Sequence, residues 1–103
     1  MQEADKIKAI QYVIDNPNTE EVYYKLLEDM GDLKMNYYDY MLTEPINCDE
    51  ELKRLPAANY ELCTALLTML LREDHFCNGS LSKRIEAGEV NCILDRMICL
   101  LLE

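Results

Sequence analysis

The stretch Tyr-Glu-Leu-Cys-Thr-Ala-Leu-Leu-Thr-Met-Leu-Leu, residues 60–71, decides the fold. Its polar residues are Glu61, Thr64 and Thr68, and Arg72 follows directly. At about 100° per helical residue, these four positions fall within roughly a quarter of the circumference. The rest of the surface is apolar, so other elements must surround this helix, which is too short to cross a bilayer (~20 apolar residues). We therefore expect a buried central helix over residues 60–71.

Helical periodicity continues on both sides of this stretch. Apolar residues recur at three- and four-residue spacing, which predicts further helices at residues 4–14, 19–30, 35–42, 48–55, 81–87 and 89–102. No segment alternates as a strand would, and no internal repeat is visible. The predicted fold is all-α: a single domain, residues 1–103, forming a compact bundle of five to six helices around the central helix.

Capping residues support these boundaries. Side chains that can accept hydrogen bonds from a first helical turn precede four of the helices: Asn18, Asn47, Asn59 and Ser80. Glycine, which tolerates the left-handed conformation that ends many helices, follows two of these four helices, at Gly31 and Gly88. The ends of the helices are therefore predicted largely by local chemistry.

The cysteines and the first residues point to one compartment. Five cysteines are an odd number for a disulfide framework, and no Cys-x-x-Cys occurs. The chain starts with polar residues, without the basic and apolar segments of a signal peptide. We expect reduced thiols, no metal or other cofactor, and a cytoplasmic location.

The charge is strongly acidic and unevenly distributed. Twenty acidic and ten basic residues give a net charge of −10. Residues 15–51 hold eleven acids against two bases, a local excess of nine. Such a field repels nucleic acid and anionic membranes and favours a basic protein partner, although the acids could also serve solubility alone.

Aromatic residues lie within this acidic region. The predicted binding surface comprises Tyr37, Tyr38, Asp39, Tyr40, Glu44, Asp49, Glu50 and Glu51. Tyrosine offers a large contact area at low entropic cost, and the acids would steer a basic partner. In the other interpretation, two tyrosines belong to the core and the acids only solvate the surface. Consecutive helical residues point about 100° apart, so at least one tyrosine ring should be near solvent.

A second candidate site follows the central helix, where the apolar period breaks. Arg72, Asp74, His75 and Cys77 could bind an anion or move a proton. In the structural interpretation, Asp74 pairs with Arg72 and Phe76 fills the core. The common nucleotide-binding, metalloprotease and hydrolase motifs are absent from the sequence, so we expect no enzyme activity.

Several short motifs lie in the C-terminal half. They are Leu-Leu-Thr at 66–68, Arg72, His-Phe at 75–76, Gly79, Arg-Ile-Glu at 84–86, Gly88 and Ile-Leu-Asp-Arg-Met at 93–97. With these motifs the chain from Leu52 onward resembles a family of small bacterial and phage-encoded domains of unknown function. Tyr-Asp-Tyr at 38–40 is a fainter match, and a basic residue, often arginine, usually stands in that family at the position of His75. The resemblance implies a compact helical fold and assigns no activity.

Two hypotheses about function remain. The first is an acidic helical domain that binds a basic protein, in its sharper form a phage-type inhibitor that occupies the basic groove of a nucleic-acid-binding protein. The second is a small enzyme or an anion- or ligand-binding domain centred on Arg72, His75 and Cys77.

Overall fold

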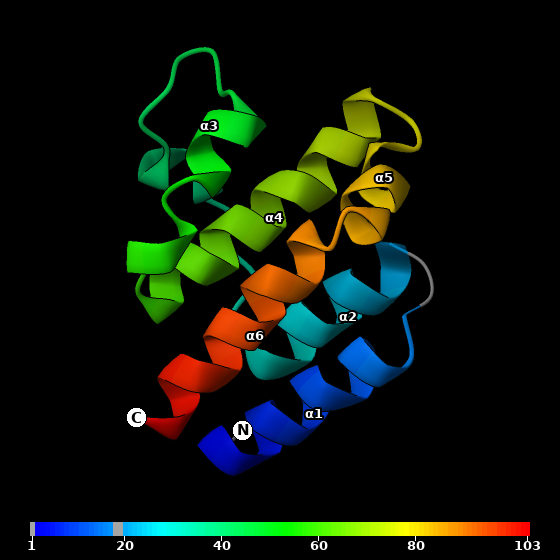
Figure 1. Ribbon diagram of the computed structural model, residues 1–103, viewed down its shortest axis with the longest axis vertical. Coiled ribbons are helices and arrows are strands. Elements are labelled where there is room, and N and C mark those ends of the chain that lie inside the picture. The colour runs from blue at the N-terminus through cyan, green and yellow to red at the C-terminus, as the bar shows by residue number, and fades with distance from the viewer. Residues whose placement is uncertain (1, 18–19) are drawn as a thin grey trace.

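Helices make up the whole regular structure of the residues described, 2–17 and 20–103, in a computed structural model (Figure 1). The elements are α1 (Glu3–Asp15), α2 (Glu20–Met30), the 3-10 helix η1 (Tyr37–Tyr40), α3 (Cys48–Leu52), the 3-10 helix η2 (Leu55–Ala57), α4 (Tyr60–Phe76), α5 (Ser80–Glu86) and α6 (Glu89–Leu102). The predicted all-α bundle is confirmed. The predicted cap Asn18 lies outside the described residues.

Helix α4 is the centre of the molecule, as predicted. Its nine consecutive residues from Cys63 to Leu71 are all buried, which requires neighbours on every side of the helix. Helix α6 runs antiparallel beside it, with α1 and α2 on one side of this pair and α3 on the other (Figure 1). Helix α5 contacts both α4 and α6.

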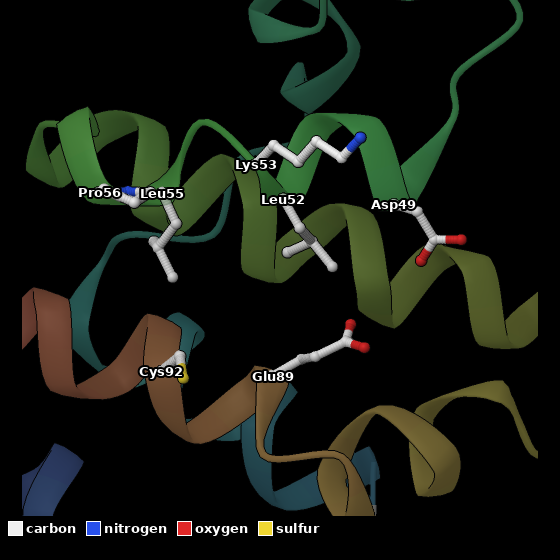
Figure 2. A pocket seen from close by; sticks show the side chains of 7 residues that line it. All are labelled: Asp49, Leu52, Lys53, Leu55, Pro56, Glu89 and Cys92. Carbon is white, nitrogen blue, oxygen red and sulfur yellow. The ribbon is translucent and has the colours of Figure 1, made fainter.

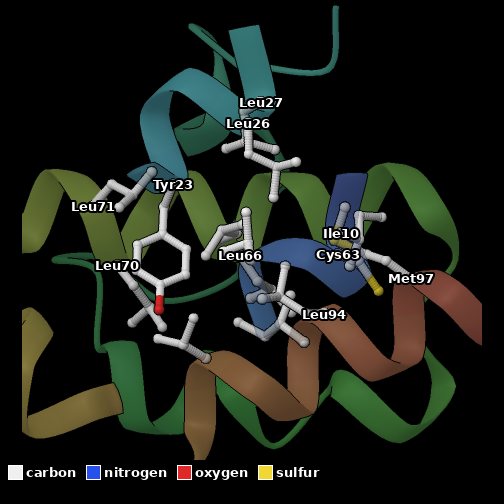
Figure 3. Packing of buried hydrophobic residues seen from close by; sticks show 14 of the residues in the cluster. Ile10, Tyr23, Leu26, Leu27, Cys63, Leu66, Leu70, Leu71, Leu94 and Met97 are labelled. Atoms are coloured by element: carbon white, nitrogen blue, oxygen red, sulfur yellow. The ribbon is translucent and has the colours of Figure 1, made fainter. Parts of the chain in front are cut away.

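The apolar faces of α4 and α6 meet those of α1 and α2 in one core (Figure 3). Its fully buried members include Ile10, Tyr23, Leu27, Leu66, Leu67, Leu70, Leu71, Ile93, Leu94 and Met97. These residues come from the faces that the apolar periodicity indicated. Burial of large side chains from four helices makes the bundle depend on each of them.

The middle of the polar stripe of α4 is covered, whereas Glu61 and Arg72 at its two ends are exposed. Thr64 and Thr68 are buried, and each hydroxyl donates to a backbone oxygen of the preceding turn. The backbone nitrogen of Lys34 donates to Thr68 Oγ1 at 3.4 Å, and the Lys34 ammonium pairs with Glu61. The segment after α2 therefore lies across the one side of α4 that the sequence left polar.

The prediction of an α-helix over residues 35–42 is wrong. Only the short 3-10 helix η1 forms there, between extended stretches of chain. Leu33, Tyr37 and Met41, which suggested helical spacing, do pack against the core and are partly buried. Since Asn, Asp and Tyr have low helix propensity, contacts with α4 decide the path of this segment.

Most cap predictions are confirmed. Asn47 accepts a hydrogen bond from the Glu50 nitrogen, and Asn59 accepts one from the Leu62 nitrogen. Gly31 has φ 73°, and the nitrogens of Gly31 and Asp32 donate to carbonyls of the last turn of α2, a Schellman end. The helix predicted over 48–55 stops at Leu52, because η2 with Pro56 replaces its last turn. Ser80 opens α5 as its first residue and does not cap it.

A charged cluster that the sequence did not predict fastens α1 to α4. Asp32, 9% exposed, accepts a hydrogen bond from Lys6 Nζ at 3.0 Å and one from the Tyr60 hydroxyl at 2.5 Å. The Lys6 ammonium also lies 5.4 Å from the centre of the Tyr60 ring. This arrangement neutralises one of the acids counted in the acidic region.

Candidate functional site

Glu51 holds the loop that carries the tyrosines. Its side chain is only 1% exposed, and Oε2 accepts hydrogen bonds from the backbone nitrogens of Leu42 at 2.9 Å and Thr43 at 2.7 Å. Oε1 accepts from Arg54 Nη1 at 2.8 Å, and the same nitrogen donates to the Tyr40 carbonyl at 2.7 Å. Burial opposes ionisation, but the hydrogen bonds from Thr43, Arg54 and Leu42 outweigh it and lower the pKa of Glu51.

The structure therefore divides the predicted binding surface. Glu51 faces inward, so its prediction as a residue of the binding surface is wrong. Tyr37 and Tyr40 are half-buried, whereas Tyr38 is 60% exposed, which confirms that one tyrosine ring lies near solvent. The other acids are all exposed: Asp39, Glu44, Asp49 and Glu50.

The second predicted site lies on the last turns of α4 and just after it. Helix α4 continues to Phe76, so the end of the apolar period at Arg72 marks the end of burial and not of the helix. Asp74 Oδ1 accepts a hydrogen bond from the Leu81 nitrogen at 3.0 Å and so supports the start of α5. The His75 ring packs at 6.2 Å from the ring of Tyr24. These positions give Asp74 and His75 contacts that stabilise helix packing.

Phe76 is 85% exposed, so the expectation that it fills the core is wrong. Phe76 lies four residues after Arg72 and eight after Thr68, on the polar side of α4. The polar Arg72 one turn earlier was a local signal for exposure, but Thr68, two turns earlier, is polar and buried, so the sequence pattern alone did not decide the exposure of this ring. The ring of Phe76 therefore adds a large apolar area to the surface at the end of α4.

Three residues of the two predicted sites, Tyr37, Arg72 and Cys77, line one groove, which we call the Phe76 groove. It encloses about 300 Å³. Its lining residues are Tyr37, Ile46 and Cys48 from the first region and Met69, Arg72, Glu73, Phe76 and Cys77 from the end of α4. Ile46, which the sequence analysis did not single out, is 37% exposed. The structure thus joins tyrosine, isoleucine and phenylalanine side chains that are up to 39 positions apart in the sequence.

Arg84 fixes one wall of this groove. Its guanidinium donates to both carboxylate oxygens of Glu73, at 3.1 and 2.9 Å. Nη1 donates in addition to Asp49 at 2.6 Å and to Glu89 at 2.8 Å, so four helices meet at one side chain. The hydrogen bond from Arg84 lowers the pKa of Glu73, and the carboxylates raise the pKa of Arg84.

Cys48 lies in the same wall beside Glu73. Burial, with the neighbouring Glu73 carboxylate, raises the pKa of Cys48 to about 12. A thiol with this pKa is almost wholly protonated near neutral pH and is a poor nucleophile. Cys48 itself is therefore poorly suited to thiol chemistry.

Comparison with known protein families identifies the family of the chain. A family model described as "Family of unknown function (DUF6508)" matches residues 1–101. The chain belongs to this family. The match extends well beyond the C-terminal half on which the resemblance in the sequence rested. No curated protein and no solved structure matches the DUF6508 chain significantly.

The described part of this DUF6508 chain contains neither a cluster of metal ligands nor a helix suited to a bilayer. No group of three or more histidine, cysteine, aspartate or glutamate side chains within residues 2–17 and 20–103 is placed to hold a metal ion. Over the same residues, no helix combines the length and apolarity needed to span a bilayer.

Proposed function

We propose that this DUF6508 chain is a non-enzymatic interaction domain that binds a basic surface of another protein. The contact surface in this proposal, which we call the acidic–aromatic face, consists of η1, the loop 41–47, the first turn of α3 and the C-terminal end of α4. The observation that carries the proposal is Phe76, 85% exposed on the wall of a groove that also contains Tyr37 and Ile46.

Apolar anchors supply the affinity in this proposal. Contacts that dominate protein interfaces are large side chains that become fully desolvated, often in a pocket of the partner. Phe76, Tyr38 and Ile46 are exposed in the free chain and can lose much of their accessible surface on binding. The Phe76 groove, which Phe76 and Ile46 line, can accept a side chain from the partner.

Acidic side chains supply the steering. Asp39 lies in η1 beside the tyrosines, Glu44 lies two residues before Ile46, and Asp49 and Glu50 lie in the first turn of α3. All four are exposed, whereas Asp32 and Glu51 are engaged in internal pairs. Exposed acids at the edge of an apolar contact favour a partner rich in lysine and arginine. One such partner is a protein whose basic groove binds nucleic acid, and the chain would then act as its inhibitor.

The experiment begins with capture of the partner from the native host, followed by affinity measurement. We expect Phe76→Ser to weaken binding at least about tenfold, because it removes an anchor. Tyr12→Ser is the matched control, since Tyr12 on α1 is also largely exposed, at 68%. Neither change should alter thermal stability. Equal binding by both variants would overturn the proposal.

A second pair of variants tests the steering. Asp39→Lys with Glu44→Lys should slow association and flatten its dependence on salt, because the charges lie next to the contact. Glu28→Lys with Glu86→Lys changes the net charge equally at exposed positions outside the acidic–aromatic face. If both double variants slow association to the same degree, only the total charge matters and the face is wrongly placed.

A further inference from the structure

A second groove lies between α3–η2 and α6. It encloses about 440 Å³ and shares no lining residue with the Phe76 groove. Leu52, Leu55 and Pro56 line one wall, and Cys92 lies on α6 opposite them (Figure 2). We call it the α3–α6 groove.

Chain geometry explains why this groove is open. Helix α3 ends at Leu52, and the chain then turns through η2, which contacts α6. Between α3 and α6, the Leu52 and Leu55 side chains point across the gap toward Cys92 and Glu89 (Figure 2). Both leucines pack on the core from one side only and remain half-buried. Additional apolar contact is therefore available at this place.

The α3–α6 groove has a surplus of negative charge at one end. Asp49 and Glu89 line it and share a single nitrogen of Arg84, Nη1. Because the other guanidinium nitrogens bind Glu73, one cation serves three carboxylates, a local charge of −2. The Asp49 side chain is 79% exposed. A cationic group that reached this end would be attracted and would meet an accessible carboxylate.

Two lysines near this end reduce the surplus without removing it. Lys53 lines the α3–α6 groove, and its ammonium pairs with Glu50 at 2.9 Å. Lys83 lines the adjoining hollow together with Asp49 and Glu89. The whole cluster of Asp49, Glu50, Glu73 and Glu89 with Lys53, Lys83 and Arg84 carries a net charge of −1.

We propose that the α3–α6 groove binds a peptide segment of another protein that carries an aliphatic side chain next to an arginine or lysine. The aliphatic group packs on Leu52, Leu55 and Pro56, and the cation reaches Asp49 and Glu89. The net charge of −10 disfavours a second copy of the chain, a nucleic acid or an anionic membrane in this place. This inference goes beyond the proposed function, because neither groove needs the other to be occupied.

The test uses a synthetic helical peptide, fluorescein-labelled, with leucines on one face and arginines on the other. Its affinity is measured by anisotropy for Cys92→Lys and Cys99→Lys. Both cysteines are exposed on α6, but only Cys92 lines the groove, so the variants add equal charge inside and outside it. We expect Cys92→Lys to weaken binding at least about tenfold and Cys99→Lys less than about twofold. Equal losses would overturn the proposal.

A second pair of variants covers the case in which Cys92→Lys does not fold. Asp49→Asn removes the exposed carboxylate of the groove, and Asp95→Asn removes an exposed charge from α6 outside it. We expect only Asp49→Asn to weaken binding, by about threefold or more. A peptide with serine in place of leucine should bind much more weakly to the unaltered chain. Undiminished binding of the serine peptide would mean attraction by charge alone and would overturn the proposal.

Alkylation of the native thiols locates the peptide. Bound peptide should slow the reaction of Cys92 at least about fivefold while Cys77 and Cys99 react as before, because covered thiolates are shielded from reagent. Protection of Cys77 alone would place the peptide in the Phe76 groove, which would overturn this inference and support the proposed function. Protection of neither thiol would overturn the α3–α6 site and leave the proposed function to its own test with the native partner.

Discussion

Thr43 donates two hydrogen bonds to one oxygen of Glu51, from its backbone nitrogen at 2.7 Å and from its hydroxyl. Thr43 Oγ1 in turn accepts a hydrogen bond from the Asn47 nitrogen at 2.8 Å, so the two ends of the loop 43–47 are bonded to each other and Thr43 is bonded to the last turn of α3. This loop carries Ile46 into the Phe76 groove. The position of Ile46, an anchor in the proposed function, therefore depends on the buried carboxylate of Glu51.

Replacing that carboxylate should be costly. Glu51→Ala leaves the Arg54 guanidinium and the Thr43 and Leu42 nitrogens without their acceptor, so we expect a loss of ~3–5 kcal/mol in the free energy of unfolding. Glu50→Ala is the matched control: Glu50 pairs with Lys53 on the surface, and its removal should cost less than about 1 kcal/mol. Urea denaturation measures both. Similar losses for the two variants would contradict the buried network.

Stability should fall in acid through the same group. The folded-state pKa of Glu51 lies below the ordinary value of 4.5, as does that of Glu73. A depressed pKa means that the unfolded chain takes up protons first as the pH falls, so the stabilisation is present above about pH 4.5 and is lost below it. Unfolding free energies measured from pH 7 to pH 3 should show this loss. Glu51→Ala should flatten the curve.

The five thiols should react in two groups. Cys77, Cys92 and Cys99 are exposed, whereas burial raises the pKa of Cys63 to about 11 and contributes to the pKa of about 12 at Cys48. Alkylation of the folded chain without reductant should therefore label three sites rapidly, and labelling in denaturant should reach all five. Intact mass measures both. Fewer than five labels in denaturant would reveal disulfides, and stoichiometric zinc in elemental analysis would contradict the prediction of metal-free thiols.

Stability should also depend on the central helix. Leu66 and Leu70 on α4 are fully buried, so truncation of either to alanine should leave a cavity and cost ~2–5 kcal/mol. Leu102→Ala is the control, because Leu102 at the end of α6 is 69% exposed. Chemical denaturation should separate the core variants from the control. Losses below ~1 kcal/mol at both core positions would be incompatible with a helix buried all round.

Local sequence determined which parts of the chain are helical and where most of those helices end. The apolar run at 60–71 required neighbours on all sides, and α4 is buried over its middle turns. Asn47 and Asn59 cap the first turns of α3 and α4, and Gly31 ends α2. All three act through hydrogen bonds that span only a few residues. Periodicity and capping act over one or two turns, so the sequence alone contains that information.

The tertiary structure decided what happens where distant segments meet. Contacts with Thr68 and the core, not helix propensity, set the path of residues 31–42. Glu51 looked like one more surface acid in a charged run, and it is buried because Thr43 and Arg54 converge on it. Phe76 looked like core, and it is exposed because α4 extends beyond the segments that cover it.

Both grooves are also features that only the tertiary structure decided. The Phe76 groove needs the loop before α3 to lie beside the end of α4, and the α3–α6 groove needs α3 and α6 to stay apart. Sequence periodicity gives the face that each helix buries but not the distance between two helices at their partly covered edges. That distance is set by packing and by long-range pairs such as Arg84 with Asp49, which lie 35 residues apart, and only the folded chain contains them.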